Sequence, residues 1–166
     1  GHFNYHSDPF HYAFELKLEM PSKGEVKDYL RTTDFETGEV SVNWGDDLGR
    51  YVRKLFVSRT DNIAVLSITQ SGKSRLNLSV IPSPVSHELI NSELIVEKDW
   101  ITYHNSYTKS QGGYDNVVRV ITRGGNAAKD GNKIIITDAE EVLLLTGIEW
   151  HEKYMEGSAK PLMESL

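Results

Sequence analysis

Apolar and polar residues alternate along most of the chain. The clearest case is the stretch HYAFELKLEM at residues 11–20, where every second residue from Tyr12 to Met20 is apolar and most of the others are charged or polar. A period of two predicts a half-buried β-strand. A slip of one residue would turn the whole apolar row toward solvent, so the register of this strand is strongly specified.

The stretch DYLRTTDFETGEVSV at residues 28–42 contains two patterns of this kind. Residues 29–35 predict one strand, and residues 40–44 predict a return strand with its valines and tryptophan facing inward. Gly38 lies between them and can adopt the positive φ that a tight turn needs. Further strands are predicted, with turn residues between them, at residues 50–58, 63–70, 76–80, 94–97, 100–107, 116–123, 133–137 and 141–148.

Short strands at this spacing predict an all-β fold, an antiparallel β-sandwich of the supersandwich kind with about ten to twelve strands. Pro82 and Pro84 are expected to end the strand that begins at residue 76. We expect residues 1–10 to be a disordered or tag-adjacent segment and residues 11–150 to form the sandwich. Residues 151–166 predict a short helical linker, capped by Ser158 and truncated before a missing C-terminal domain.

Composition excludes several classes of protein. The chain has 166 residues, enough for one domain with a real core, and a net charge of −6 with scattered basic residues. A nucleic-acid surface needs a concentrated basic face, so we expect no nucleic-acid partner. The chain has no cysteine, which excludes disulfides and thiolate chemistry. No apolar run approaches the roughly 18 residues that a membrane span requires.

Three short motifs suggest chemistry, and none of them has a complete pattern. The first is the set of histidines at positions 2, 6 and 11, which lacks a carboxylate at ligand spacing. Asp46-Asp47 lacks the remaining ligands of a calcium loop. Gly72-Lys73-Ser74 lacks the first glycine of a phosphate loop and joins two strands. We therefore predict no catalytic residue, no metal site and no cofactor.

One aromatic cluster has two interpretations. It surrounds the glycine-bearing loop at residues 110–113 and consists of Trp100, Tyr103, His104, Tyr107 and Tyr114. Aromatic faces at a loop rim could stack on the rings of an oligo- or polysaccharide. The alternative is that these side chains simply alternate between core and surface. Both interpretations stay open at this level.

Two long stretches resemble a known family. They are DYLRTTDFETGEVSVNW, followed by YVRKLFVSRTDNIAVLSIT and RLNLSV, and the later DAEEVLLLTGIEW. Together with the turn residues between them they are similar to the amino-terminal domain of glycoside hydrolase family 95, which includes bacterial α-L-fucosidases. The resemblance covers roughly residues 14–150. The chain departs from the family pattern at Thr32-Thr33 and in the loop around Gln111.

The resemblance implies a β-sandwich followed by a helical linker and an (α/α)₆ barrel that carries the catalytic acid and base. No catalytic residue of that barrel lies in this chain. The expected function is therefore a non-catalytic domain that packs against the catalytic domain of the same polypeptide, shapes its substrate cleft and lies outside the cytoplasm. This hypothesis predicts an apolar surface patch. The alternatives are a carbohydrate-binding module and a self-sufficient glycosidase with two suitably spaced carboxyls.

Overall fold

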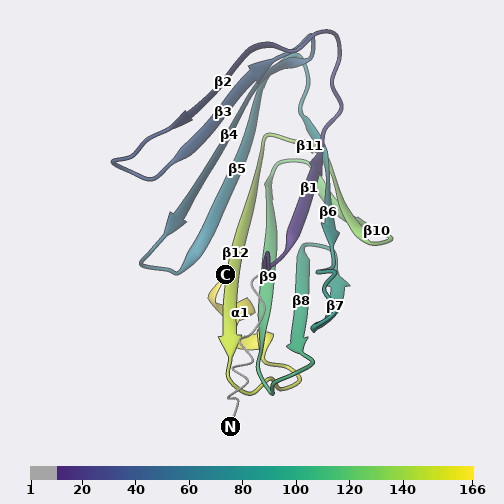
Figure 1. The fold of residues 1–166 in the computed structure, drawn as a ribbon. Helices are drawn as coiled ribbons and strands as arrows, with labels where there is room; N and C mark the ends of the chain where they lie inside the picture. Colours follow the sequence, from purple (N-terminus) through teal and green to yellow (C-terminus); the bar gives the residue numbers. More distant parts are fainter. Residues whose placement is uncertain (1–10) are drawn as a thin grey trace.

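The structure is a computed structural model that describes residues 11–166. Two antiparallel β-sheets lie face to face, and a short helix follows the last strand (Figure 1). The described residues form twelve strands, which confirms the all-β sandwich predicted from the alternating pattern. The expected disorder of residues 1–10 lies outside the described part of the chain.

The two sheets differ in size. The small sheet contains, in spatial order, β1 (Glu15–Glu19), β6 (Leu76–Ser83), β11 (Lys133–Ala139) and β10 (Asn126–Asp130). The large sheet contains, in spatial order, β2 (Lys27–Thr33), β3 (Val40–Gly45), β4 (Gly49–Ser58), β5 (Ile63–Gly72), β12 (Glu141–His151), β9 (Gly113–Arg123), β8 (Trp100–Tyr107) and β7 (Ile90–Val96). The helix α1 (Ala159–Ser165) follows β12.

The last strand in the sequence lies in the middle of the large sheet. Strands β2 to β5 are consecutive neighbours on one side, and strands β7 to β9 are consecutive neighbours on the other. Between these two groups, β12 pairs with β5 along residues 141–147 and with β9 along residues 141–151. The large sheet is therefore continuous only because β12 bonds to both halves.

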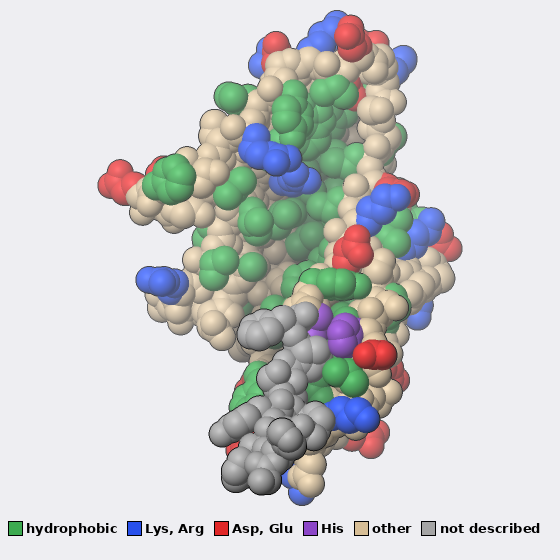
Figure 2. Space-filling model, viewed as in Figure 1, with side chains coloured by type: hydrophobic (Ala, Val, Ile, Leu, Met, Phe, Trp, Pro, Cys, Tyr) green, Lys and Arg blue, Asp and Glu red, His purple; other side chains and the backbone are tan. Residues whose placement is uncertain are grey.

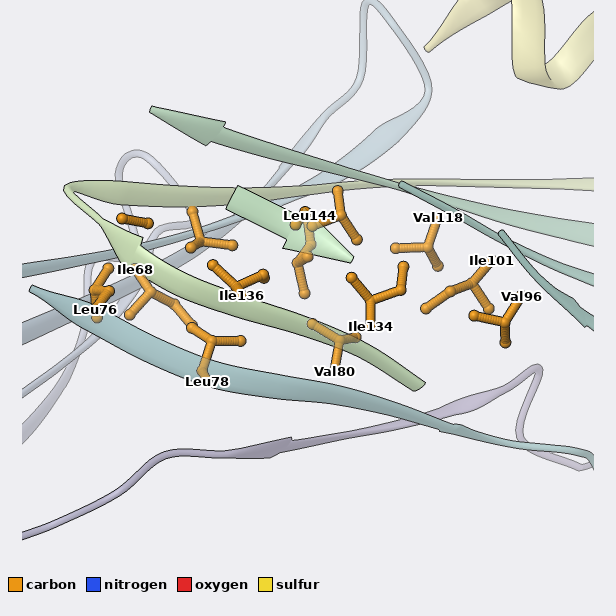
Figure 3. Close-up of a cluster of buried hydrophobic side chains, with 14 of the residues drawn as sticks. Ile68, Leu76, Leu78, Val80, Val96, Ile101, Val118, Ile134, Ile136 and Leu144 are labelled. Carbon is orange, nitrogen blue, oxygen red and sulfur yellow. The ribbon is translucent and has the colours of Figure 1, made fainter. Parts of the chain in front are cut away.

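The main core lies between the two sheets. One buried cluster contains Ile68 of β5, Leu144 of β12 and Val118 of β9 together with Leu78 and Ile136 of the small sheet (Figure 3). We call the side of the large sheet that carries this cluster the inner face. Because side chains alternate along a strand, the odd-numbered residues of β9 and β12 point to the opposite side, the outer face.

Two expectations about the strands were wrong in detail. Tyr12 is half exposed, because β1 begins only at Glu15. Strand β6 does not end at Pro82 but continues through it, with Pro82 opposite Leu16 of β1. On the other side of β6, strand β11 pairs only as far as Val80, so it does not need the N–H that proline lacks.

A strand was missed where the sequence shows a glycine-rich loop. Gly124 and Gly125 both have positive φ and turn the chain after β9. Strand β10 then forms by pairing with β11, although Ala127 is its only buried residue. Its composition, with two alanines and no β-branched residue, gives no strand signal of its own.

Candidate functional site

A buried carboxylate lies on the outer face near the start of β9. Asp115 is 0% exposed. His104 stands directly opposite on β8, and its Nδ1 lies 2.6 Å from Asp115 Oδ1. His151, the last residue of β12, places its Nε2 3.0 Å from Asp115 Oδ2. Two imidazoles from neighbouring strands therefore donate hydrogen bonds to one buried carboxylate.

The segment that follows β12 supplies two more donors to the same group. The Tyr154 amide donates to the carbonyl of Gln111 at 2.8 Å, which holds the segment against the loop before β9. The Tyr154 hydroxyl donates to Asp115 Oδ1 at 3.2 Å, and the Ser158 hydroxyl donates to Oδ2. Each carboxylate oxygen thus accepts two hydrogen bonds. We call these five residues the Asp115 cluster: His104, Asp115, His151, Tyr154 and Ser158.

The free-energy cost of burying a carboxylate explains why both oxygens of Asp115 have hydrogen-bond donors. A buried carboxylate is costly unless it is hydrogen-bonded, and charge-assisted bonds are roughly twice as strong as neutral ones. Burial and the neighbouring Asp115 charge raise the pKa of Tyr154 to about 12, so its phenol remains a donor. Ser158 is the N-cap residue of α1, as expected, but its hydroxyl makes no cap hydrogen bond and donates to Asp115 instead.

Helix α1 packs on the outer face beside the cluster. Ala159 and Leu162 are buried against Val117 of β9, with Met163 among the side chains at the rim. Gly147 of β12 makes this approach possible, because a Cβ there would lie 2.7 Å from Leu162 Cδ1. A side chain at this position would have to displace the helix or the leucine, so the glycine sets how closely α1 docks.

An arginine joins α1 to the aromatic cluster predicted from the sequence. Arg119 Nη1 donates to the Leu166 carbonyl at 2.9 Å. The guanidinium carbon lies 5.2 Å from the centre of the Trp100 ring, which is cation–π range. Trp100 also packs against the small buried cluster of Val117, Ala159 and Leu162. Its ring therefore contacts the protein itself on the outer face.

Apolar residues extend from this place across the outer face. Arg119 stands opposite Leu145 of β12, which stands opposite Val65 of β5, which stands opposite Phe56 of β4. Phe56 is 40% exposed and the other two are partly buried. We call Phe56, Val65 and Leu145 the outer apolar row. The outer apolar row thus lies on the same face as α1, and Phe56 is its most exposed member.

The structure does not bring the five predicted sugar-contact residues into one groove. Trp100 and His104 point to the outer face, whereas Tyr103 and Tyr107 point to the inner face because they lie one residue out of phase. Tyr114 also points inward, opposite Trp150. The sheet itself therefore separates the five side chains, and sugar contact by any of them remains a prediction.

Two of the tyrosines in this set have structural partners. Tyr103 is 0% exposed and donates to the carbonyl of Glu15 at 2.9 Å. Tyr114 is 4% exposed and donates to the carbonyl of Ala13 at 2.9 Å. Burial raises the pKa of both phenols well above the ordinary value. These two tyrosines fasten β1 and the segment before it to the large sheet.

The composition of the Asp115 cluster suggests a catalytic triad, but its geometry is different. A serine nucleophile needs a hydrogen bond to a histidine base. Ser158 instead donates directly to the carboxylate, and both histidines do the same. All donors converge on one acceptor, so the arrangement fastens residues 151–158 to the sheet and does not activate a nucleophile.

Two residues from the incomplete motifs, Asp46 and His11, have structural contacts within the described part of the chain. Asp46 is partly desolvated, yet amide bonds from Lys23, Leu48 and Gly49 and the Tyr51 hydroxyl lower its pKa. It therefore shapes a turn. The ring of His11 stacks on Tyr114, with centroids 5.6 Å apart.

The described residues contain neither a metal cluster nor a membrane helix. Within residues 11–166, no group of three or more histidine, cysteine, aspartate or glutamate side chains is arranged to hold a metal ion. His2 and His6 lie outside this range. Among the described helical residues, none forms a helix long and apolar enough to cross a membrane.

Sequence reasoning missed most of the Asp115 cluster. The sequence analysis names His104 only as part of an aromatic cluster and Ser158 only as a helix cap, and it gives Asp115, His151 and Tyr154 no role of their own. One signal was available, since Asp115 and His151 are polar residues at the ends of apolar strands. The spacing could not reveal that three separate segments converge on one point.

The comparisons agree with the fold. A solved structure named "Putative kojibiose phosphorylase from human microbiome" matches with a TM-score of 0.62 and 8% sequence identity. The match covers 91% of this chain and 24% of that one, so the chain spans about a quarter of its structural neighbour. At this identity the likeness shows the fold alone. Among curated proteins, none matches the sequence.

The family assignment comes from the sequence itself. The family described as "Glycosyl hydrolase family 65, N-terminal domain" matches residues 2–151. The expected kinship with an N-terminal domain of a glycosyl hydrolase is therefore confirmed, whereas the comparisons give no support to family 95 in particular. Because this match spans most of the 166 residues, the chain belongs to the family of glycosyl hydrolase family 65 N-terminal domains.

Proposed function

We propose that this sandwich is the non-catalytic N-terminal domain of a larger glycosyl hydrolase, called the parent enzyme below. The sandwich packs against the catalytic domain of that enzyme through its outer face. One observation carries the proposal: three hydrogen bonds to Asp115, from His151, Tyr154 and Ser158, fix residues 151–158 on this face. A domain that follows in the chain would therefore begin beside the outer apolar row.

The same arrangement supports a role at the substrate cleft. The loop at residues 108–111 is exposed and lies against the segment that Asp115 fastens. A catalytic domain placed on the outer face would border this loop. The sandwich would then position the catalytic domain and form one rim of its cleft, without supplying an acid or a base.

A pair of cysteine variants tests the packing. The chain has no native cysteine, so within the sandwich a single thiol reports on one position. Phe56→Cys tests the outer apolar row, and Phe35→Cys is the matched control at a turn where the side chain is 95% exposed. We expect the thiol at position 56 to react with a thiol reagent at least about tenfold more slowly in the parent enzyme than in the 166-residue chain, because a covered thiol reacts only after local opening.

The control defines the opposite outcome. The thiol at position 35 should react at the same rate in both proteins. If the thiol at position 56 also reacts equally fast in both, the outer face is not covered in the parent enzyme, and the proposed packing is wrong.

The substrate of the parent enzyme is a separate proposal. The family 95 resemblance implies α-L-fucoside hydrolysis outside the cytoplasm, and the structural neighbour is named for phosphorolysis of kojibiose. Assays of the parent enzyme with an α-L-fucoside and with kojibiose plus phosphate separate the two. The carbohydrate-binding alternative requires that the isolated chain bind a glycan, with loss of affinity in Trp100→Ala or Tyr107→Ala, measured by calorimetry.

A further inference from the structure

Part of the inner face of the large sheet is bare. The small sheet has four strands and the large sheet eight, so the small sheet cannot cover the whole inner face. Neighbouring strands lie about 4.8 Å apart, and the difference of four strands amounts to roughly 20 Å of sheet width. Figure 2 shows a hollow in this region in which hydrophobic side chains gather.

The bare area is apolar. Leu55 and Val57 of β4 point inward and are 40% and 66% exposed. Ile148 and Trp150 of β12 also point inward and are 41% and 60% exposed. Leu66 of β5 stands opposite Leu55 and is partly buried. Exposed apolar side chains gathered on one face of a domain mark an interaction site.

Strand β1 lies on the side of the small sheet toward the bare area (Figure 1). Strand β1 is the outermost strand of the small sheet and pairs only with β6 among the described strands. Its apolar residues Leu16 and Leu18 pack on the core, whereas Lys17 and Glu19 face away and form an ion pair at 2.5 Å. The backbone groups on the open side of β1 are unpaired by any described strand, which makes this edge a template for strand addition.

Charge indicates what kind of segment fits. Arg31 of β2 and Arg53 of β4 stand on either side of Val42 on the inner face. Among the described residues, Arg53 forms no ion pair and the Arg31 side chain donates to the Tyr29 hydroxyl at 3.1 Å. An occupant with a carboxylate among apolar side chains would complement this surface.

We propose that an extended segment of the parent enzyme, outside these 166 residues, adds to β1 as the next strand of the small sheet. Its inward side chains are apolar and cover Leu55, Val57 and Ile148, and a carboxylate among them meets Arg53. The inference rests on the proposed function, because it requires a longer polypeptide. The length available is consistent with this, since the chain spans only 24% of its structural neighbour.

The test uses the residue next to the outer-face probe. Val57 follows Phe56 on β4 and points to the opposite face of the sheet. In Val57→Cys we expect thiol labelling at least about tenfold slower in the parent enzyme than in the 166-residue chain, because the added strand covers the thiol. Phe35→Cys again serves as the control, with equal rates in both proteins.

A second measurement needs no substitution. Hydrogen exchange of the amides of Glu15–Glu19 should be slower in the parent enzyme, because the open side of β1 gains hydrogen bonds. Protection of the thiol at position 57 without protection of these amides would mean that something other than a strand covers the face, and the proposal would fail. Equal labelling rates at position 57 in both proteins would also overturn it.

The remaining occupant is a second copy of this chain. If labelling of the Val57→Cys variant of the 166-residue chain slows as its concentration rises, a copy of the chain covers the face and the proposal is wrong. The outer-face probe keeps the two proposals apart. Protection at position 56 alone supports the proposed packing of the outer face and refutes the strand addition. Protection at position 57 alone supports the strand addition and refutes the proposed packing.

Discussion

Asp115 is the residue on which the outer face depends. Its two oxygens accept hydrogen bonds from His104, His151, Tyr154 and Ser158, and it is 0% exposed. In Asp115→Asn, an NH₂ group replaces one of these oxygens. It is itself a donor and faces the two donors that the oxygen had accepted from. We expect the free energy of unfolding to fall by about 1–3 kcal/mol, as for other buried polar groups that lose a partner.

Urea denaturation at neutral pH measures this loss. The matched control is Asp130→Asn, because Asp130 is exposed and its pair with Lys133 at 3.3 Å lies on the surface. Its effect should stay within about 0.5 kcal/mol. If the two variants lose the same free energy of unfolding, the buried hydrogen bonds at Asp115 contribute no more to stability than a surface ion pair.

Tyr154 gives the same cluster a pH dependence. Its pKa is raised from 10 to about 12 in the folded chain. The folded state therefore holds the phenolic proton where the unfolded state has lost it, so stability falls as pH rises from 10 to 12. The raised pKa values of Tyr103 and Tyr114 add to the same loss.

The Tyr154→Phe variant isolates one of these three contributions. We expect its unfolding free energy to decline less steeply above pH 10 than that of the unmodified chain, in urea titrations at successive pH values. Phe35→Leu, at a turn position 95% exposed and without an ionisable group, should keep the original slope. A slope unchanged in Tyr154→Phe would contradict the raised pKa of this phenol.

At the scale of elements, the contact between α1 and β12 depends on Gly147. A Cβ at this position would lie 2.7 Å from Leu162 Cδ1, so Gly147→Ala should destabilise the fold by about 1–3 kcal/mol through overpacking. Leu162→Ala removes the obstructing atoms and costs about 2 kcal/mol on its own. In the double variant the clash disappears, and the alanine at position 147 should cost much less.

A double-mutant cycle in urea therefore carries this prediction. The expected coupling is at least about 1 kcal/mol, within the range for residues in direct contact. Strictly additive losses would show that α1 does not pack on Gly147. Gly38→Ala is unsuitable as a control, because Gly38 has φ of 71° and a substitution there is strained whatever the space around it.

The elements also show how far the sequence was informative. Alternating apolar residues predicted most strands because burial on one face dictates the pattern, as in Leu76, Leu78 and Val80 of β6. Strand β10 was missed because it forms through its partner β11 and buries only Ala127. The Asp115 cluster could not be predicted, since its donors come from segments far apart in the chain.

At the scale of the whole molecule, the sandwich and its C-terminal segment differ in importance. The main cluster of buried side chains contains no residue beyond Leu144, whereas α1 belongs to a separate small cluster with Val117. A chain of residues 11–151 should therefore keep its β-sheet circular dichroism. It should lose about 3 kcal/mol of stability, because Leu162 is no longer buried and Asp115 loses two donors.

Residues 11–166 are the matched comparison, since both chains lack the first ten residues. Urea midpoints and circular dichroism give the two readouts. Loss of all sheet signal in residues 11–151 would show that the C-terminal segment is required for folding. An unchanged midpoint would show that it adds no stability.

The place of β12 has a consequence for synthesis. This strand is made last among the twelve described strands, yet it stands between β5 and β9 and joins two groups of strands that are otherwise unconnected within their sheet. A nascent chain that ends before residue 141 holds two hairpin arrays with open edges. Strand β12 must therefore emerge from the ribosome before the large sheet can form as a whole. Until then the open edges of both strand groups are accessible to chaperones and to each other.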